Sequence, residues 1–376
     1  MRSLNIALIR QRYTADGGAE RSTEVILGAL QTQGVGVTLI TRAWRAQGGV
    51  AAEICNPFYI GSLWRDWGFA RAVRRVLETK KFSLVQSHER IAGCDIYRAG
   101  DGVHREWLRQ RMRTLSIFGK LRIWISPYHH YVKFVELALF SSPRLRAVIC
   151  NSHRVKKEIQ RYFSVPEHRL HVIYNSVDVQ AFSPELKRHR DSLRKQFSIP
   201  QEATLFLFVG SGFERKGVRM VLEAMAKLPP SAYLIVVGKD KRFGKFLQQA
   251  KALKINDRVR FVGVQSDVKL FYGAADALVL PTLYDPFPNV VLEAMASGLP
   301  VITSIQCGAA ELIEHGRNGY VCDALDTPAL IESMHALMNA GIQKRLSDEA
   351  RDTALSLNQE AMVEQLLGLY RGLLVG

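Results

Sequence analysis

The sequence predicts an α/β protein with two doubly wound, Rossmann-like domains that face a central cleft. Short apolar strands alternate with helices along the chain, an order typical of parallel sheets that are covered on both faces. The length of 376 residues suits two domains of similar size, because single cores rarely grow beyond about 250–300 residues. A hydrophobic content of 47% and a charged content of 23% are those of a globular chain.

The first series of strands defines an N-terminal domain over residues 1–183. The predicted strands are Ile6–Ile9, Val35–Thr41, Ser83–Ser87, Ala147–Asn151 and His171–Tyr174, with an amphipathic helix near Glu20–Leu30. A polar stretch that is rich in Lys and Arg and bounded by prolines follows at Ser183–Pro200. This composition is typical of an exposed linker, so we predict that the stretch connects the two domains.

A second series of strands defines a C-terminal domain over residues 184–355. The strands are Thr204–Val209, Tyr233–Val237, Val259–Val262, Ala277–Leu280, Pro300–Thr303 and Gly319–Val321, with helices Val218–Leu228 and Val290–Ala296 among them. Ligands of doubly wound domains bind beyond the carboxyl ends of the strands, where helix N-termini and backbone N–H groups meet anions. We therefore expect functional side chains in the loops that follow strands.

Positive charge is concentrated in the first half of the chain. The whole chain carries a formal net charge of +16, and residues 1–183 hold 28 Lys and Arg against 14 Asp and Glu. Residues 184–376 hold 23 against 21 and are nearly balanced. This segregation favours an anionic partner for the N-terminal domain, namely phospholipid, lipopolysaccharide phosphate or nucleic acid. A surface whose charge only keeps the protein soluble is the alternative.

Other classes of protein are disfavoured by the sequence. It contains no run of 18 or more apolar residues, so we predict no transmembrane helix. The segment Met1–Ile9 is predicted to form a strand and lacks the features of a signal peptide, so we expect a cytoplasmic location. The five cysteines are odd in number and never form a CxxC pair, which argues against a disulfide framework and a structural zinc site.

A glycine-rich loop with two cations follows the strand Thr204–Val209. It reads Gly210-Ser211-Gly212-Phe213-Glu214-Arg215-Lys216-Gly217 and leads into a helix. The glycines permit a tight turn close to a ligand, and the two cations at the helix start suit a diphosphate. The loop is not a Walker motif. Taken alone, it is equally well explained as a surface turn with solvated cations.

Two carboxylates flank the start of the predicted helix Val290–Ala296. Asp285 lies in the preceding loop and Glu293 lies on the helix. Glu293 is suited to accept both hydroxyls of a ribose, and Asp285 is suited to bind sugar hydroxyls further along the same ligand. Backbone N–H groups at the helix N-terminus are available to a sugar, from Phe287, Asn289 and Val290. The alternative is an acidic first turn favoured by the helix dipole.

Together these motifs resemble the retaining, group 1 glycosyltransferases of family 4, which have the GT-B fold. The resemblance is carried by Gly17-Gly18-Ala19-Glu20-Arg21, Val172–Asp178, Arg215-Lys216-Gly217, and Asp285–Glu293 followed by Ala294–Pro300. It covers almost the whole chain. Within the family the chain is most similar to the lipopolysaccharide core glucosyltransferase I group, through Gly210–Val218 and Tyr128–Glu136.

The resemblance implies that Arg215 and Lys216 bind the donor diphosphate and stabilise the leaving group. Glu293 would bind the ribose, residues 263–267 would frame the base, and Asp285 would bind the transferred sugar. The family has Glu where this chain has Asp285, which leaves the identity of the donor sugar open. Catalysis in these enzymes is ascribed to front-face attack, so we expect neither a carboxylate nucleophile nor a metal ion, and the chain lacks a DxD signature.

On the N-terminal side, the resemblance implies that Gly17 and Gly18 approach the donor from the other domain. His88 follows the strand Ser83–Ser87, where relatives place a histidine near the donor sugar, so we predict His88 as a sugar ligand. A loop histidine without function is the alternative. Asp101, one loop later, is predicted as an acceptor-side contact or proton acceptor. Residues 356–376 would form a helix that packs back on the N-terminal domain.

A basic and apolar segment lies at residues 104–133. It has seven Lys or Arg and one acid, interleaved with Trp and aliphatic residues. The residues expected to meet a membrane or an acceptor are Arg105, Trp107, Arg109, Arg111, Arg113, Lys120, Arg122 and Trp124. This composition, without a spanning apolar run, predicts an interfacial segment on an anionic inner membrane. Nucleic-acid binding and a structural helix with core-facing Trp are the alternatives.

We therefore predict a metal-independent, retaining hexosyltransferase that needs no cofactor. The expected donor is a nucleoside diphosphate sugar, foremost UDP-glucose or a related UDP-hexose. The expected acceptor is a lipopolysaccharide core or another cell-envelope glycolipid, and the enzyme is expected to be peripheral on the cytoplasmic face of the inner membrane. The alternatives are a GT-B epimerase and, from another class, a basic nucleic-acid-binding protein, although we expect no nucleic-acid partner.

Overall fold

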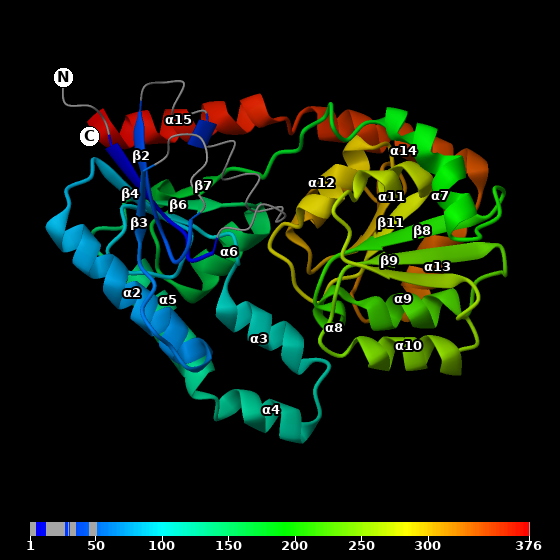
Figure 1. Cartoon of the computed structure of the whole chain (residues 1–376), viewed down its shortest axis with the longest axis horizontal. Coiled ribbons are helices and arrows are strands. Elements are labelled where there is room, and N and C mark those ends of the chain that lie inside the picture. Colours follow the sequence, from blue (N-terminus) through cyan, green and yellow to red (C-terminus); the bar gives the residue numbers. More distant parts are fainter. Residues whose placement is uncertain (1–4, 13–26, 29, 31–34, 45–50, 376) are drawn as a thin grey trace. The chain divides into compact units, whose positions relative to one another are not determined.

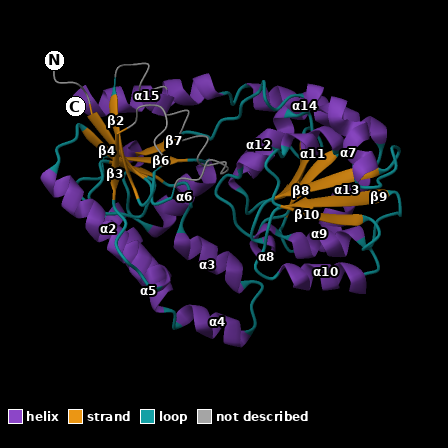
Figure 2. Ribbon diagram, in the orientation of Figure 1, coloured by secondary structure: helices purple, strands orange, loops and turns teal. Residues whose placement is uncertain are grey.

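The structure is a computed structural model that describes residues 5–12, 27–28, 30, 35–44 and 51–375. The chain divides into two compact units, Met1–Tyr174 with Glu360–Gly376 and Asn175–Gln359. Each unit is built on one parallel sheet with helices on its faces (Figures 1 and 2). The structure thus confirms the predicted α/β fold of two Rossmann-like sheets.

Within the described residues, the sheet of the first unit has seven strands in the order β3-β2-β1-β4-β5-β6-β7. They are β1 (Asn5–Ile9), β2 (Gly36–Thr41), β3 (Ala51–Ile54), β4 (Leu84–Ser87), β5 (Ile96–Arg98), β6 (Ala147–Cys150) and β7 (Leu170–Val172). The helices are α2 (Gly61–Thr79), α3 (His104–Met112), α4 (Ile117–Trp124), α5 (Pro127–Phe140), α6 (His153–Tyr162) and α15 (Gln359–Val375), with a short 3-10 turn at Glu167–Arg169.

Both faces of the first sheet are buried. Successive side chains of a strand point to opposite faces, so one strand contributes to two core clusters. In β1, Ile9 belongs to a core cluster with Phe69 of α2, whereas Leu8 belongs to a second cluster with Tyr370 of α15. The Tyr370 hydroxyl also donates to the Gln86 side-chain carbonyl at 2.6 Å. The last helix of the chain therefore completes the core of the first unit.

The second unit has a six-stranded sheet in the order β10-β9-β8-β11-β12-β13. The strands are β8 (Thr204–Val209), β9 (Ala232–Val237), β10 (Val259–Gly263), β11 (Ala277–Leu280), β12 (Val301–Ser304) and β13 (Gly319–Cys322). The helices are α7 (Arg190–Gln196), α8 (Phe213–Lys216), α9 (Val218–Met225), α10 (Phe243–Ala252), α11 (Lys269–Ala274), α12 (Asn289–Ala296), α13 (Thr327–Ala336) and α14 (Ala340–Leu355), with 3-10 helices at Pro184–His189 and Gly308–Leu312.

The predicted strands are confirmed with small shifts at their ends, and two further strands were not predicted. Strand β5 has only three residues and ends on the buried Arg98, so it lacks an apolar run. Strand β3 has the polar residue Glu53 and is partly exposed at the sheet edge. The helix predicted near Glu20–Leu30 lies largely outside the described residues.

The predicted linker at Ser183–Pro200 is wrong, because this segment is helical and packs within the second unit. Arg194 of α7 is fully buried. Its guanidinium donates to the Asp276 carboxylate at 2.8 Å and to the backbone carbonyls of Ala274, Pro200, Gln201 and Ala203 at 2.8–3.1 Å. A cation that is satisfied in this way belongs to a core rather than to a flexible connection.

The substitution Arg194→Met is expected to lower the free energy of unfolding by about 3–5 kcal/mol, because it leaves four backbone carbonyl groups without their donor and removes one of the two arginines that pair with the Asp276 carboxylate. The matched control is Arg219→Met, since Arg219 is 53% exposed and pairs only with Glu223 one helical turn away. An exposed pair of this kind contributes at most about 1 kcal/mol. Urea denaturation followed by circular dichroism measures both. Equal losses in the two variants would contradict a structural role for Arg194.

Candidate functional site

Each sheet has one point at which the strand order reverses, and the loops beside that point are the expected ligand loops. In the first sheet the reversal lies between β1 and β4, and in the second sheet it lies between β8 and β11. The glycine-rich loop follows β8 and the stretch Asp285–Glu293 follows β11. His88 follows β4. The sequence motifs therefore lie where parallel sheets bind ligands.

The glycines of the loop after β8 are required by its path. Gly212 and Gly217 have left-handed backbone conformations, with φ of +79° and +87°. A Cβ on Gly217 would lie 2.1 Å from the Pro281 carbonyl oxygen, so no side chain fits there. The close approach joins the two loops, and the Leu283 N–H donates to the Arg215 carbonyl at 2.8 Å.

The structure brings Arg215, Lys216 and Asp285 together in one ionic cluster. The Asp285 Oδ2 atom accepts from Arg215 Nη1 at 3.0 Å and pairs with Lys216 Nζ at 2.6 Å. The Lys216 and Asp285 side chains are 10% exposed, whereas that of Arg215 is 36% exposed. Burial raises the pKa of Asp285, but the charges of Lys216 and Arg215 outweigh it and hold that pKa below its ordinary value.

The cluster keeps positive charge available for a further anion. Two cations share one ionised carboxylate, which leaves one net positive charge. Asp285 Oδ1 accepts no hydrogen bond from the residues that the structure describes, so it remains an acceptor for a hydroxyl. The arrangement can thus bind a phosphate through the cations and a polyol through the carboxylate.

Glu293 lies on α12 and is buried, with 6% of the residue exposed. Its Oε2 atom accepts from the Tyr272 hydroxyl at 2.8 Å, and this bond fixes the direction of the carboxylate. Asn175 holds the start of the same helix, because its amide donates to Asn289 Oδ1 at 2.7 Å and to the Phe287 carbonyl at 3.3 Å. No role was predicted for Tyr272, which has no pattern around it, or for Asn175, although Asn175 lies within the motif Val172–Asp178.

The first turn of α12 holds the remaining donor residues predicted from sequence. Phe287 is buried just before the helix, and Val290 is half-buried in its first turn. The Val290 carbonyl accepts from the Tyr272 hydroxyl at 3.5 Å. Gly17 and Gly18 lie outside the residues that the structure describes.

Both ring nitrogens of His88 lie within hydrogen-bond distance of a donor nitrogen. Arg10 Nη1 lies 3.2 Å from Nδ1, and the Gln86 side-chain amide lies 3.0 Å from Nε2. A guanidinium and an amide nitrogen can only donate, and a neutral imidazole has one acceptor nitrogen, so the neutral ring accepts from Arg10 or from Gln86 but not from both. Burial, together with the charges of Arg10 and Arg98, lowers the pKa of His88 well below its ordinary value.

Asp101 is exposed and lies in a different local network from His88. Its carboxylate pairs with Arg90 at 3.4 Å, and 73% of its side chain is exposed. Arg90 in turn donates from Nε to the buried Glu136 carboxylate at 2.9 Å. Among the contacts of the described residues, none joins Asp101 to His88.

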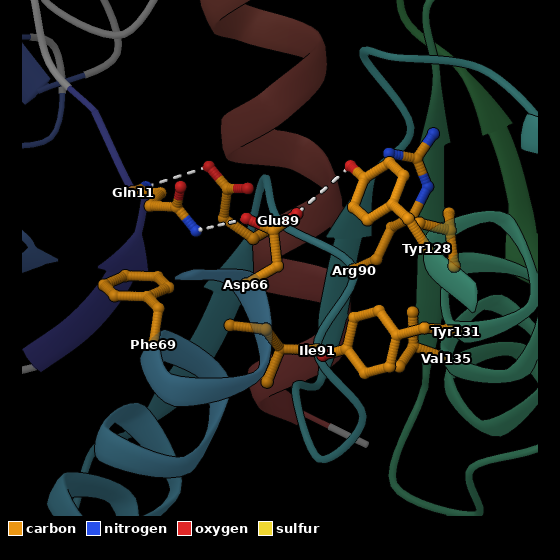
Figure 3. A pocket seen from close by; sticks show the side chains of 10 residues that line it. Gln11, Asp66, Phe69, Glu89, Arg90, Ile91, Tyr128, Tyr131 and Val135 are labelled. Carbon is orange, nitrogen blue, oxygen red and sulfur yellow. Dashed lines mark hydrogen bonds between the residues drawn. The ribbon is translucent and has the colours of Figure 1, made fainter. Parts of the chain in front are cut away.

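A small pocket is lined by Glu89, the residue that follows His88 in the chain (Figure 3). Its lining comprises Gln11, Asp66, Phe69, Glu89, Arg90, Ile91, Tyr128, Tyr131, Val132 and Val135. Glu89 accepts from the Gln11 backbone N–H at 2.8 Å, and burial raises the pKa of Glu89 above its ordinary value. Sequence analysis missed Glu89, because a single acid after a strand forms no recognisable pattern.

The basic segment divides into a packed part and an exposed part. On α3, the acid Glu106 is buried and accepts from Arg109, while Arg111 lies over the Trp107 ring at 6.0 Å. Arg105 stacks over Phe163 at 5.8 Å. Arg113, directly after α3, donates to Gln110 at 3.1 Å. These side chains are therefore largely engaged with the protein itself.

Helix α4, in contrast, presents apolar and basic side chains to solvent. Ile117, Phe118 and Trp124 are 82%, 79% and 72% exposed, and Leu121 is also exposed. Lys120 and Arg122 are exposed on the same helix. An exposed apolar set of this size on one short helix is typical of a contact surface.

Neither a metal site nor a membrane-spanning helix is found among the residues that the structure describes. Within them, no group of three or more His, Cys, Asp or Glu side chains is placed to hold a metal ion. In the same part of the chain, no helix combines the length and the apolar character needed to cross a bilayer.

Two family models match the chain in tandem. The model of Glycosyltransferase Family 4 matches residues 16–181, and the model of Glycosyl transferases group 1 matches residues 189–353. The two matches together cover most of the chain and meet near the boundary between its two units.

Among curated relatives, the lipopolysaccharide glucosyltransferase WaaG of Escherichia coli strain K12 is 26% identical over 380 residues, covering 99% of this chain and 100% of WaaG. The N-acetyl-alpha-D-glucosaminyl L-malate synthase of Bacillus anthracis is 29% identical over 239 residues, which is 62% of each chain.

Solved structures show the same fold. The crystal structure of WaaG, a glycosyltransferase involved in lipopolysaccharide biosynthesis, matches with a TM-score of 0.82 and 25% identity over 95% of this chain and 98% of WaaG. The structure of Anabaena Alr3699/HepE in complex with UDP-glucose matches with a TM-score of 0.75 and 19% identity over 98% of this chain and 100% of HepE. The chain therefore belongs to the group 1 glycosyltransferases of family 4, and it is a GT-B enzyme similar to the WaaG-like lipopolysaccharide glycosyltransferases.

Proposed function

We propose that this enzyme is a retaining, metal-independent hexosyltransferase that uses a UDP-hexose, foremost UDP-glucose, and acts on a lipopolysaccharide core or a related cell-envelope glycolipid. The observation that carries the donor part is the cluster of Arg215, Lys216 and Asp285 after β8 and β11. In this cluster two cations and a carboxylate lie close enough together to bind one ligand. The named substrates of WaaG and HepE support the choice of sugar and acceptor.

In the proposed mechanism the two cations bind the donor diphosphate. Their net charge with Asp285 is +1, and negative charge grows on the diphosphate as the glycosidic bond breaks. Cations fixed before the reaction stabilise this developing charge without reorganising. Fixed side-chain cations thereby supply the charge that a metal ion supplies in other transferases.

The two carboxylates then orient the rest of the donor. Glu293, whose direction is set by Tyr272, accepts hydrogen bonds from the ribose hydroxyls. Asp285 accepts a sugar hydroxyl at Oδ1 while Oδ2 stays with the cations. Neither acts as a nucleophile, since that role in a retaining glycosidase needs a pair of carboxyl groups about 5–5.5 Å apart across the scissile bond. The acceptor hydroxyl attacks from the side of the leaving group, whose oxygen takes up the proton.

On the acceptor side, we propose that His88 contacts the donor sugar and Asp101 the acceptor. The neutral His88 ring is suited to hydrogen bonding rather than to ion pairing. The exposed Asp101, which pairs with Arg90, is suited to meet a large substrate.

We also propose that α4 binds the anionic cytoplasmic face of the inner membrane, so that the enzyme is peripheral. Its exposed apolar side chains enter the interface, and each nearby cation adds about 1 kcal/mol on an anionic surface. A second exposed apolar set lies at the start of α2, with Phe58 and Ile60 more than two-thirds exposed. Asp66 of α2 bonds Tyr128 of α5 at 3.2 Å, so α2 packs beside the helix that follows α4 (Figure 1).

Two variants test separately how the enzyme binds the ribose and the diphosphate of the donor. Glu293→Gln is expected to weaken UDP and uridine binding alike by about tenfold or more, because charged hydrogen bonds to the ribose are lost. Lys216→Met is expected to weaken UDP binding but not uridine binding, since it removes only a phosphate contact. The control is Glu223→Gln, a change of a partly exposed acid on α9. Isothermal titration calorimetry of the wild type with UDP-, GDP- and ADP-glucose identifies the donor, and no heat with any of them would refute the proposal.

The membrane proposal predicts a contrast between α4 and α3. The double variant Phe118→Ser with Trp124→Ser is expected to reduce binding to phosphatidylglycerol vesicles by tenfold or more, because each such buried side chain contributes about 1.5–3 kcal/mol. A triple change of Arg109, Arg111 and Arg113 to Gln is expected to have a smaller effect, since these side chains contact the protein. UDP affinity is expected to stay unchanged in both.

Vesicle co-sedimentation measures this contrast, with Leu247→Ser on α10 as the control for a lost exposed apolar group. Unchanged vesicle binding of the α4 variant would contradict the membrane assignment.

An epimerase would release free sugar from the donor without an acceptor. A nucleic-acid-binding protein would retain salt-dependent oligonucleotide affinity in Glu293→Gln.

A further inference from the structure

We infer that the pocket of Figure 3 is a subsite for an uncharged, polyhydroxylated sugar unit of the acceptor, and that Glu89 selects for this unit. The inference rests on the proposed glycosyl transfer. It adds a subsite, a binding residue and a preference between neutral and anionic sugars.

The pocket lies at the strand reversal of the first sheet. Gln11 follows β1, Glu89 and Ile91 follow β4, and the walls come from α2 and α5. His88, the proposed contact of the donor sugar, is the residue directly before Glu89. A sugar bound here is therefore next to the residue that is proposed to meet the donor.

Gln11 organises the polar side of the pocket (Figure 3). Its backbone N–H donates to Glu89 Oε1 at 2.8 Å, and its side-chain amide donates to Asp66 Oδ1 at 3.2 Å. Asp66 Oδ2 accepts from the Tyr128 hydroxyl at 3.2 Å, and Arg65 pairs with the same carboxylate at 2.7 Å. Both oxygens of Asp66 are thus occupied.

Glu89 keeps one oxygen for a ligand. Its Oε2 atom accepts no hydrogen bond from any residue that the structure describes. A half-buried carboxylate with one bonded and one open oxygen is suited to accept a hydroxyl, which restores the hydrogen bond that water provided. The bond from Gln11 holds the open oxygen in place before the ligand arrives.

The charges of the lining favour a neutral ligand. Arg90 is its one cation among the residues described, and three of its five N–H groups donate to Glu136 at 2.9 Å, the Gly102 carbonyl at 3.1 Å and Asp101 at 3.4 Å. A phosphate or carboxylate on the sugar would be repelled by the Glu89 carboxylate, and Arg90 is the one cation of the described lining that could offset this repulsion. The hydroxyl groups of a neutral sugar can donate to the open Glu89 Oε2 atom and to other polar groups that line the pocket.

The opposite side of the pocket is apolar and aromatic. Phe69, Ile91, Val132 and Val135 lie there, with the Tyr131 ring beside them in Figure 3. The enclosed part has a volume of about 50 Å³, which suits a few hydroxyl groups or a hydroxymethyl arm rather than a whole ring. The C–H face of the ring would then cover the mouth against the aromatic side chains.

The test compares a neutral and an anionic probe on the full chain, methyl α-mannoside and mannose 6-phosphate, by saturation-transfer NMR. We expect the wild type to bind the neutral probe and to bind the phosphate at least tenfold more weakly. Glu89→Gln is expected to weaken binding of the neutral probe about tenfold. It is also expected to reduce the difference in affinity between the two probes, because the side chain loses its charge but keeps its shape. The control is Glu78→Gln, an exposed acid on α2.

Three results would overturn the inference: no transfer to the neutral probe, equal binding of both probes by the wild type, or unchanged binding in Glu89→Gln. Calorimetry with UDP on the same samples distinguishes this failure from that of the proposed function. Intact UDP binding with no effect of Glu89→Gln would reject the subsite alone. Absent UDP binding in the wild type would reject the donor site, whatever the sugar probes do.

Discussion

The reversal of strand order within each parallel sheet is the constraint on which the site depends. At that point neighbouring loops leave the sheet in opposite directions, and the backbone cannot fill the space between them. In the second unit the loops after β8 and β11 meet so closely that Gly217 has room for a hydrogen only. This contact places Arg215, Lys216 and Asp285 within bonding distance, although Asp285 is far from the two cations in sequence.

Both units use the same physical device to hold polar side chains in a buried setting. A carboxylate is fixed at one oxygen by a donor from a neighbouring loop, and the other oxygen accepts no hydrogen bond from the described residues. Asp285 is fixed by cations and Glu89 is fixed by the Gln11 backbone. The two environments push the pKa values in opposite directions, since charge pairing dominates at Asp285 and burial dominates at Glu89.

The strands and the donor motifs could be predicted because they have local signals. Uniform apolar runs such as Thr204–Val209 mark buried parallel strands, and the Arg215 and Asp285 motifs have fixed spacing. Arg194 could not be recognised as a core residue, because its partner Asp276 lies 82 positions away and charge alone suggests a surface. The pairing of Tyr272 with Glu293 and of Gln11 with Glu89 likewise arises only when distant loops meet, so no sequence pattern records it.

The course of the chain has a consequence for its synthesis. Met362, Leu366 and Tyr370 belong to the same core as Ile6 and Leu8, so this core receives its last helix only after the whole second unit has been translated. The second unit is a continuous stretch and can close before that moment. The first unit is therefore begun before the second but completed after it, because its apolar strands depend on a helix that follows the second unit in the chain.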